Sequence, residues 1–222
     1  MSSVNRPPRA RRPRVTTDDV VAACIEIVDS EGVDALTIRR AAQACGLSPM
    51  GVYRHVRDKD DLLDRVVDTV VSPALRELHV SGTWDEQVAG LFRYARRLFL
   101  GHPGVAALCV LRPTPVAGVA RFYSRVLAAL AEGGFTGTDA VHAFDTLLMF
   151  MFGSVLWETP RSAGIRGQLV SVAIGDDDAT QIIERASELS RRDPAEYFEA
   201  GLTTILDGLR AGLHHSNPDA RA

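Results

Sequence analysis

Residues 37–56 read TIRRAAQACGLSPMGVYRHV, a stretch that contains the parts of a helix-turn-helix. Thr37 is a favourable N-cap for a short helix over residues 38–44, and the small side chain of Ala42 allows another helix to approach closely. Gly46 can adopt the left-handed backbone conformation of a tight turn. The stretch therefore predicts a two-turn helix followed by a sharp turn.

A second short helix is expected directly after this turn. Ser48 is its expected N-cap, and Pro49 is tolerated at the first helical position because that position needs no backbone donor. Leu47 and Val52 would hold the second helix against the first, and Val56 extends its buried face. The pattern predicts a recognition helix whose N-terminal half can enter a major groove of DNA.

Side chains on the open face of this recognition helix are candidates for contacts to DNA. Arg54 carries the guanidinium fork that fits a guanine edge, although a solvated surface charge is the alternative. Thr37, Tyr53 and Lys59, the only lysine in the sequence, could hold phosphates, and a packed aromatic ring is the alternative for Tyr53. The other residues expected to be exposed on this helix are Ser48, Met50, Gly51 and His55.

Helical periodicity continues outward in both directions, and no β alternation of useful length is present. Thr17 is expected to cap a helix over 17–31 that Gly32 ends, and Asp58 is expected to cap a helix over about 59–78. Further helices are expected over residues 84–100, 105–111, 115–131, 138–157 and 194–213, with another candidate near 180–189. The sequence predicts an all-α fold with an N-terminal three-helix helix-turn-helix head and a larger C-terminal helical bundle.

The distribution of charge favours nucleic-acid binding at the N-terminal end. The whole chain has a formal net charge of -3, but residues 1–57 hold nine arginines and six acidic side chains, a net charge of +3. Positive potential concentrated in this way attracts phosphates. Residues 1–15 are rich in arginine and proline and are expected to form a disordered basic arm. The predicted domains are this arm, a DNA-binding head over 16–62 and a ligand-binding and dimerisation domain over 63–216.

Other classes of protein have little support in the sequence. No Glu-x-x-His pair, nucleophile motif or glycine-rich phosphate loop suggests an enzyme, and the three cysteines are too few and too widely spaced for a zinc motif. No cofactor and no metal are therefore expected. A helical adaptor for proteins is a further alternative, against which the basic arm and the recognition helix argue. The longest apolar run, 147–156, is shorter than the ~18 residues of a membrane span, so we expect a cytoplasmic protein without membrane contact.

The head resembles the DNA-binding domain of the tetracycline-repressor (TetR) family. The resemblance rests on the Gly-Leu-Ser turn at 46–48, on Tyr53-x-His55-Val56 and on Lys59-x-x-Leu62-Leu63-Asp64. It implies a ligand-responsive transcriptional regulator, usually a repressor, with an activator as the alternative. It also implies base contacts through Ser48, Pro49, Met50, Gly51 and Arg54, and phosphate contacts near Thr37, Tyr53, His55 and Lys59.

The body resembles the regulatory domain of the tetracycline repressors in this family. Trp84 opens a helix, Arg112-Pro113-Thr114 follows the short helix over 105–111, and a Gly134-Phe135 turn precedes the next long helix. The resemblance implies that the short helix and the loop at 112–114 transmit ligand binding to the helix over 59–78, and that this movement swings the two heads of a dimer apart.

The expected effector is small and largely apolar. Positions that match the ligand-recognising histidines of the tetracycline repressors lie near Leu75 and Leu108 and are apolar, so a magnesium–tetracycline complex is not expected. Pockets of this kind are lined mainly by hydrophobic and aromatic groups. Core or dimer packing is the alternative for each candidate. His142 and Asp145, three residues apart, could share a face as metal ligands or as a polar contact to the effector, and a satisfied or exposed pair is the alternative. The candidates are Tyr94, Leu108, Leu111, Arg112, Phe144, Leu148, Met149, Phe152 and Trp157.

Two long apolar helices, 138–157 and 194–213, are the expected homodimer interface. Gly201 and Gly208 lie seven residues apart, nearly on one face, and would allow another helix to approach closely. Pairing with the symmetry mate would give a four-helix interface, as the resemblance also implies. Two recognition helices would then meet successive major grooves about 34 Å apart on a pseudo-palindromic operator.

Overall fold

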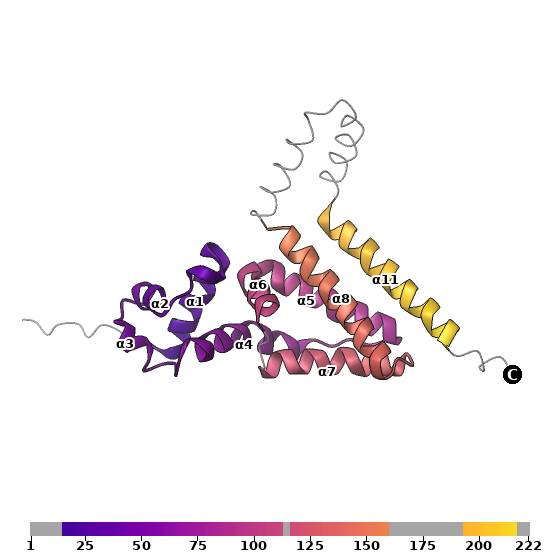
Figure 1. Ribbon diagram of the computed structural model, residues 1–222, viewed down its shortest axis with the longest axis horizontal. Coiled ribbons are helices and arrows are strands. Elements are labelled where there is room, and N and C mark those ends of the chain that lie inside the picture. The colour runs from indigo at the N-terminus through magenta and orange to yellow at the C-terminus, as the bar shows by residue number, and fades with distance from the viewer. Residues whose placement is uncertain (1–14, 113–115, 160–192, 217–222) are drawn as a thin grey trace, which may run out of the picture.

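The computed structural model describes residues 15–112, 116–159 and 193–216, and all regular elements in this part of the chain are helices (Figure 1). The predicted all-α fold is therefore confirmed. Arm residues 1–14 and the candidate helix near 180–189 lie outside the described residues. In chain order the elements are α1 (Thr17–Glu31), the 3₁₀ helix η1 (Val33–Ala35), α2 (Ile38–Ala44), α3 (Pro49–Val52), α4 (Lys59–Glu77), α5 (Trp84–Gly101), α6 (Pro103–Leu111), α7 (Ala117–Glu132), α8 (Gly137–Trp157) and α11 (Pro194–Ser216).

The ends of α1 show how local side chains set a helix boundary. Gly32 ends the helix with a φ of 92°, as expected for glycine at this position. The prediction that Thr17 caps α1 is wrong by one residue, because Thr16 is the cap. The Oγ1 atom of Thr16 accepts a hydrogen bond from the backbone N–H of Asp19 at 3.1 Å, and the Asp19 carboxylate accepts one from the backbone N–H of Thr16 at 2.7 Å. Only Thr16 has an acidic residue three positions later, which this reciprocal pair requires.

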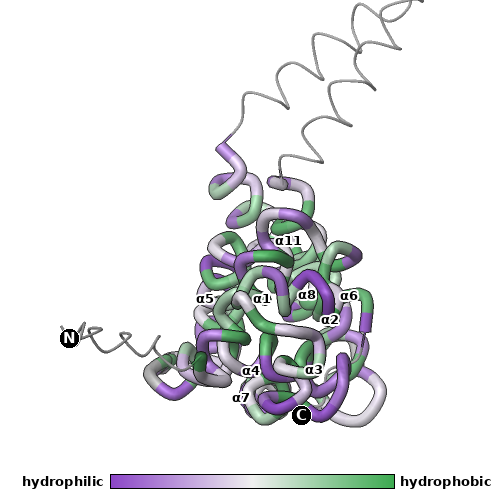
Figure 2. The backbone as a smooth tube through the Cα atoms, turned by 90° about the vertical axis from the view of Figure 1, so that its left-hand side faces the viewer, coloured by the Kyte–Doolittle hydropathy of each residue, from purple (hydrophilic) through white to green (hydrophobic). Residues whose placement is uncertain are grey.

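The head packs α1, α2 and α3 around small and β-branched side chains. Val20, Leu36, Ala41 and Val52 are fully buried there. Val52 is the buried residue of α3, so one valine anchors the recognition helix to the rest of the head. Figure 2 views the molecule from the head end and shows apolar and polar residues alternating along the helices, as expected for helices with one buried face.

One continuous helix, α4, leaves the head and runs into the body (Figure 1). It contacts α1 in the head and α5, α6 and α7 in the body. Leu62 near its start and Val66 one turn later are fully buried. The predicted division between residues 62 and 63 falls inside this helix, so the head and the body share α4.

The body is a bundle in which α5, α7 and α8 enclose an aromatic and aliphatic core, with α11 lying along α8 (Figure 1). The rings of Phe150 on α8 and Phe198 on α11 are stacked with centroids 5.4 Å apart. A Cβ at Gly201 would lie 2.3 Å from Cζ of Phe150, so any larger residue here would force the Phe150 ring to move. A Cβ added at Gly208 would meet no atom within 4 Å, so only Gly201 of the two glycines serves close packing within the described chain.

Candidate nucleic-acid interface

The turn before α3 and the cap of α3 follow from a few local contacts. Gly46 has a φ of 64°, and the backbone N–H of Leu47 donates to the Ala42 carbonyl at 2.8 Å, which closes the turn. The hydroxyl of Ser48 accepts a hydrogen bond from the Gly51 N–H at 3.1 Å. A Cβ at Gly51 would lie 3.2 Å from Cβ of Leu47, so a bare backbone lets α3 pack close to the turn.

The chain continues to coil beyond the last residue of α3. The backbone N–H of Arg54 donates to the Gly51 carbonyl at 3.3 Å, and that of His55 donates to the Val52 carbonyl at 2.9 Å. These bonds between residues three apart extend the recognition segment by one tighter turn. Arg54 is therefore held on the same short segment as the start of α3.

The structure leaves most of the predicted DNA-binding side chains open to solvent. Met50 is 73% exposed and Tyr53 is 47% exposed, so the alternative of a fully packed Tyr53 ring does not apply. Gly51 and His55 are partly buried. The remaining predicted residues, Thr37, Ser48, Pro49, Arg54 and Lys59, are all exposed.

His55 connects the recognition segment to the first helix. Its Nδ1 atom lies 3.2 Å from Oγ1 of Thr17 at the start of α1. The same region contains a cavity of about 480 Å³, and Val15, the first described residue of the chain, lines it. The other lining residues are Thr16, Thr17, Leu47, Gly51, Arg54 and His55. The arm is therefore joined to the head directly beside α3.

Arg39 is a basic residue that the sequence analysis did not single out. Its neighbour Arg40 donates two hydrogen bonds from Nε to the Glu31 carboxylate, each at 3.1 Å, and this pair lowers the pKa of Glu31. Arg39 is exposed and makes no ion pair with the described residues. Two arginines after Thr37 were a visible signal in the sequence, but the fold was needed to show which of them Glu31 engages.

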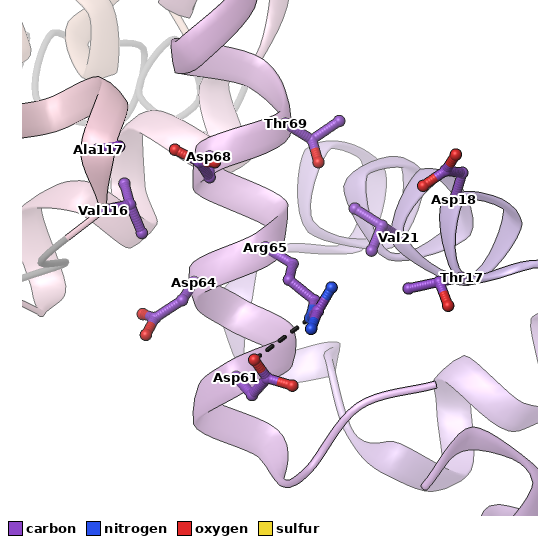
Figure 3. A pocket seen from close by; sticks show the side chains of 10 residues that line it. All are labelled: Thr17, Asp18, Val21, Asp61, Asp64, Arg65, Asp68, Thr69, Val116 and Ala117. Atoms are coloured by element: carbon purple, nitrogen blue, oxygen red, sulfur yellow. Dashed lines mark ion pairs between the residues drawn. The ribbon is translucent and has the colours of Figure 1, made fainter. Parts of the chain in front are cut away.

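A second cavity, of about 360 Å³, lies where α1, α4 and α7 meet, and polar side chains line most of it (Figure 3). Asp61 pairs there with Arg65, whose Nε lies 3.2 Å from Oδ1 of the aspartate. A hydrogen bond from the backbone N–H of Arg57 is the main reason why the pKa of Asp61 is lowered. Among the described residues, no group of three or more histidine, cysteine or acidic side chains is placed to hold a metal ion.

Helix α6 is attached to the head at its N-terminal end. Oδ1 of Asp29 on α1 accepts hydrogen bonds from the backbone N–H groups of Gly104 at 2.8 Å and Val105 at 3.4 Å. Oδ2 of Asp29 lies 2.8 Å from Nδ1 of His102. A carboxylate from another helix thus caps the start of α6, which begins at Pro103, two residues earlier than predicted.

The other end of α6 is attached to α4. Arg112 directs its Nη1 atom to Oδ1 of Asp60 at 3.1 Å and its Nη2 atom to Oδ1 of Asp64 at 3.2 Å. The contact at the start of α6 is also close, because a Cβ at Gly104 would lie 2.0 Å from the carbonyl oxygen of Val28. Any displacement of α6 must therefore act on α1, on α4 or on both.

The predicted effector-binding residues are distributed over the body. Leu108 and Phe144 are buried, and Tyr94, Arg112, Leu148 and Phe152 are partly buried. Leu111, Met149 and Trp157 are exposed. Neither of the two cavities described above is lined by any of these nine residues.

Two of these candidates, Phe144 and Phe152, make aromatic contacts to residues outside the set. The rings of Phe99 and Phe152 have centroids 5.3 Å apart, and those of Tyr123 and Phe144 have centroids 4.6 Å apart. Burial raises the pKa of the Tyr123 hydroxyl, and the nearby Cys109 and Asp145 add to the rise. Tyr123 is a candidate that sequence reasoning missed, because nothing in its local pattern distinguishes it from an ordinary helix residue.

Two family profiles match this chain. The profile described as "Bacterial regulatory proteins, tetR family" matches residues 20–66, and the profile described as "Tetracyclin repressor-like, C-terminal domain" matches residues 78–213. These ranges contain the recognition helix and most of the helical body.

Individual relatives align along most of their length. The transcriptional repressor DrrR1 of Streptomyces coeruleorubidus is 28% identical over 217 residues, which cover 92% of this chain and 80% of the relative. The class A tetracycline repressor from Escherichia coli is 29% identical over 204 residues, which cover 88% of this chain and 91% of the relative. Apo ActR from Streptomyces coelicolor superimposes with a TM-score of 0.72 at 30% identity, covering 93% of this chain and all of ActR.

Proposed function

The chain belongs to the tetracycline-repressor (TetR) family of ligand-responsive transcriptional regulators, which are not enzymes, and we propose that it acts in the cytoplasm as a homodimeric repressor. A small, largely apolar effector would release it from a pseudo-palindromic operator. The observation that carries this proposal is the connection of an open recognition helix, through α1 and α4, to helix α6 of the body.

Two kinds of contact to DNA are assigned to the head. Arg54 reads a guanine edge, helped by the exposed Ser48, Pro49 and Met50 and the partly buried Gly51 at the start of α3. Phosphates are held by Thr37, Tyr53, His55 and Lys59, to which we add the exposed Arg39. The arginines of residues 1–14 would reach phosphates of the same duplex, since the arm joins the head beside α3.

Exposed apolar side chains on α8 and α11 support dimerisation through these helices. Val141, Met149 and Trp157 on α8 and Tyr197 on α11 are large and exposed in the single chain. By length and composition alone, α8 is apolar enough to cross a membrane, but it packs against α5, α6, α7 and α11. We therefore assign its exposed apolar side chains to a four-helix interface with a second copy.

Helix α6 is the proposed route by which the effector acts on the head. An effector that displaces α6 would also displace α4, because Arg112 at the end of α6 forms ion pairs with Asp60 and Asp64 on α4. Because the α4 helices of both subunits would move, the spacing of the two recognition helices would change. A dimer whose recognition helices no longer match the groove spacing loses operator affinity.

An apolar effector is favoured by the composition of the body. ActR, the relative described above, has been solved in complex with actinorhodin and with (S)-DNPA. In this chain the matched positions Leu75 and Leu108 are apolar and buried, which argues against a magnesium chelate. We propose an aromatic small molecule that packs against the side chains around Phe144 and Phe152.

The first test is the selection of bound sequences from random duplex DNA by the purified full-length protein. The proposal predicts recovery of a pseudo-palindrome with half-sites about one helical turn apart. If no sequence is enriched at low salt, the proposed DNA-binding function is wrong. The recovered duplex then serves as the probe in effector screening, in which release of the duplex identifies the effector.

A further inference from the structure

We infer that Arg96 is a specificity-determining residue of the effector site, and that its guanidinium binds a carboxylate group on an aromatic effector. This inference rests on the proposed function and adds an acidic group to the aromatic molecule proposed above. The observation that carries it is a buried guanidinium, where α5 meets α8 and α11, with a donor from which no described residue accepts.

Arg96 pairs only part of its guanidinium within the described chain. It is 7% exposed and is the only buried basic residue among those that the structure describes. Its Nη2 atom donates to Oε1 of Glu158, whereas its Nε atom, also buried, has no hydrogen-bond partner in the described ranges. Because a buried donor of a charged group is costly without an acceptor, an acceptor from outside the described chain would stabilise this arginine.

A second arginine on the same helix shows a completed pair. Arg93, one turn before Arg96, donates from Nε to both carboxylate oxygens of Glu199 at 2.9 Å and from Nη2 to Oε2 at 2.7 Å. Nε and Nη2 form one edge of the guanidinium, and a carboxylate can bind such an edge with two parallel hydrogen bonds. Arg96 uses only the Nη2 half of this edge, so its Nε atom is available to a second carboxylate oxygen.

The surroundings of Arg96 fit an aromatic molecule that carries this carboxylate. Its Cζ atom lies 4.8 Å from the centroid of the Phe198 ring, which is stacked on Phe150. Phe99, on the next turn of α5, contacts Phe152, around which we propose that the effector packs. Residues three apart on a helix are separated by about 4.5 Å along its axis, so one small aromatic acid can contact both places.

Glu158 is placed where an incoming carboxylate can displace it. It is the residue directly after α8, and its backbone N–H donates to the Val155 carbonyl at 3.2 Å, so its charge lies at the negative end of the helix dipole. Its side chain is 21% exposed, whereas that of Arg96 is 8% exposed. Glu158 therefore gains hydration when it leaves the pair, and the effector carboxylate replaces it on Nη2 while also accepting from Nε.

The test compares aromatic carboxylates with their uncharged primary amides, with benzoate, 2-naphthoate and anthracene-2-carboxylate as the probes. Binding to the purified full-length protein is measured by calorimetric titration, and release of the recovered operator is measured in parallel. We expect at least one carboxylate to bind about 10- to 100-fold more tightly than its amide and to release the operator, because only the carboxylate offers charged acceptors to the Nε and Nη2 edge.

Glu158→Gln is the sharpest variant, since it keeps Arg96 and removes the competing charge. It should lower the midpoint of thermal unfolding, because the buried guanidinium loses its charged partner. The carboxylate should bind this variant several-fold more tightly than it binds wild type and should restore the midpoint, whereas the amide should do neither. Glu199→Gln, which alters the Arg93 pair instead, is the matched control and should keep the wild-type preference.

A double variant, Arg96→Met with Glu158→Gln, removes both charges and should bind carboxylate and amide equally. If this variant does not fold, Glu158→Gln still decides the inference, because it retains the buried arginine.

The outcomes separate this inference from the proposed function. Failure to bind any duplex selectively would overturn the proposed function itself. Selective operator binding with no carboxylate preference for any probe, or with no gain in carboxylate affinity in Glu158→Gln, would show that Arg96 only packs α5 against α8 and α11. A carboxylate preference that survives in the double variant would assign the acidic group to another residue.

Discussion

The head and the body differ in where they leave large apolar side chains exposed. In the described part of the head, Met50 and Tyr53 are the exposed large hydrophobic residues, and both belong to the recognition segment. In the body, such residues are spread over several helices, namely Leu100, Val110, Leu111, Tyr123, Leu127, Val141, Met149, Trp157 and Tyr197. In the described head, the exposed large apolar side chains thus belong to the segment that we propose contacts DNA, whereas in the body they include the side chains of α8 and α11 that we propose form the dimer interface.

The largest expected effect is the loss of the dimer, which should follow from a charge placed on the proposed interface of α8. Met149→Asp places a charge in the proposed interface of α8, and we expect a monomer in sedimentation analysis. Operator affinity should fall by a factor on the order of 10² to 10⁴, because two linked heads bind one duplex far better than one head does. Leu127→Asp, on the exposed side of α7, is the matched control and should remain dimeric. A dimeric Met149→Asp protein would exclude this surface as the interface.

The next largest effect is on stability, and it concerns the contact between α6 of the body and α1 of the head. Gly104→Ala places a Cβ 2.0 Å from the Val28 carbonyl oxygen, and we expect the free energy of unfolding to fall by about 1–3 kcal/mol in chemical denaturation. Gly101→Ala is the control, since no atom lies within 4 Å of its added Cβ, and it should change stability by less than about 0.5 kcal/mol. Equal stabilities of the two variants would contradict a close contact of α6 with α1.

A smaller effect, on DNA affinity, is expected from substitutions in the recognition segment of the head. Arg54→Ala should cost about 1–3 kcal/mol of binding free energy on the recovered operator and much less on scrambled duplex, measured by titration at fixed salt. Arg57→Ala is a suitable comparison, because Arg57 is also exposed but pairs with Asp61. Equal losses on both duplexes for Arg54→Ala would mean that Arg54 holds a phosphate and reads no base.

The smallest expected effect is a pH dependence within the body. Hydrogen bonds from Thr83 and Arg210 lower the pKa of Asp85 from 3.8 to about 2. A lowered pKa means that this carboxylate stabilises the fold above about pH 4 and loses its contribution as the pH falls towards 2. Asp85→Asn should therefore reduce stability at pH 7 by about 1 kcal/mol and leave little difference from wild type near pH 2. A constant difference across this range, in thermal unfolding, would exclude the carboxylate charge as its source.

The sequence was most informative about the head, because the signals there are local. A cap, a turn glycine and a valine anchor act over three to five residues, so Ser48, Gly46 and Val52 could be interpreted without the fold. The cap expected at Thr17 lies at Thr16, because both threonines suit an N-cap and only Thr16 has an acidic residue three positions later to complete the reciprocal pair.

The body and its connection to the head depend on contacts between residues far apart in the sequence, which local patterns do not reveal. Asp29 caps α6 through Gly104, 75 residues away, and Arg112 reaches Asp60 over 52 residues. The periodicity of α8 marks apolar positions such as Phe144 and Met149, but it cannot distinguish a core position from an exposed one. The structure buries Phe144 and exposes Met149. The nine predicted effector-binding residues are spread between core and surface, so helical periodicity alone could not group them into one pocket.

Hydrogen exchange of α6, measured with and without the recovered operator, tests the central claim most directly. Coupling between two binding sites is reciprocal, so a body that controls the head must respond when the head binds DNA, even without the effector. We predict that operator binding changes the exchange rates of the backbone amides of residues 104–111. These include Gly104 and Val105, whose N–H groups donate hydrogen bonds to Asp29. Changes confined to residues 17–58, with α6 unaffected at saturating operator, would contradict the proposed link between the DNA-reading head and the body.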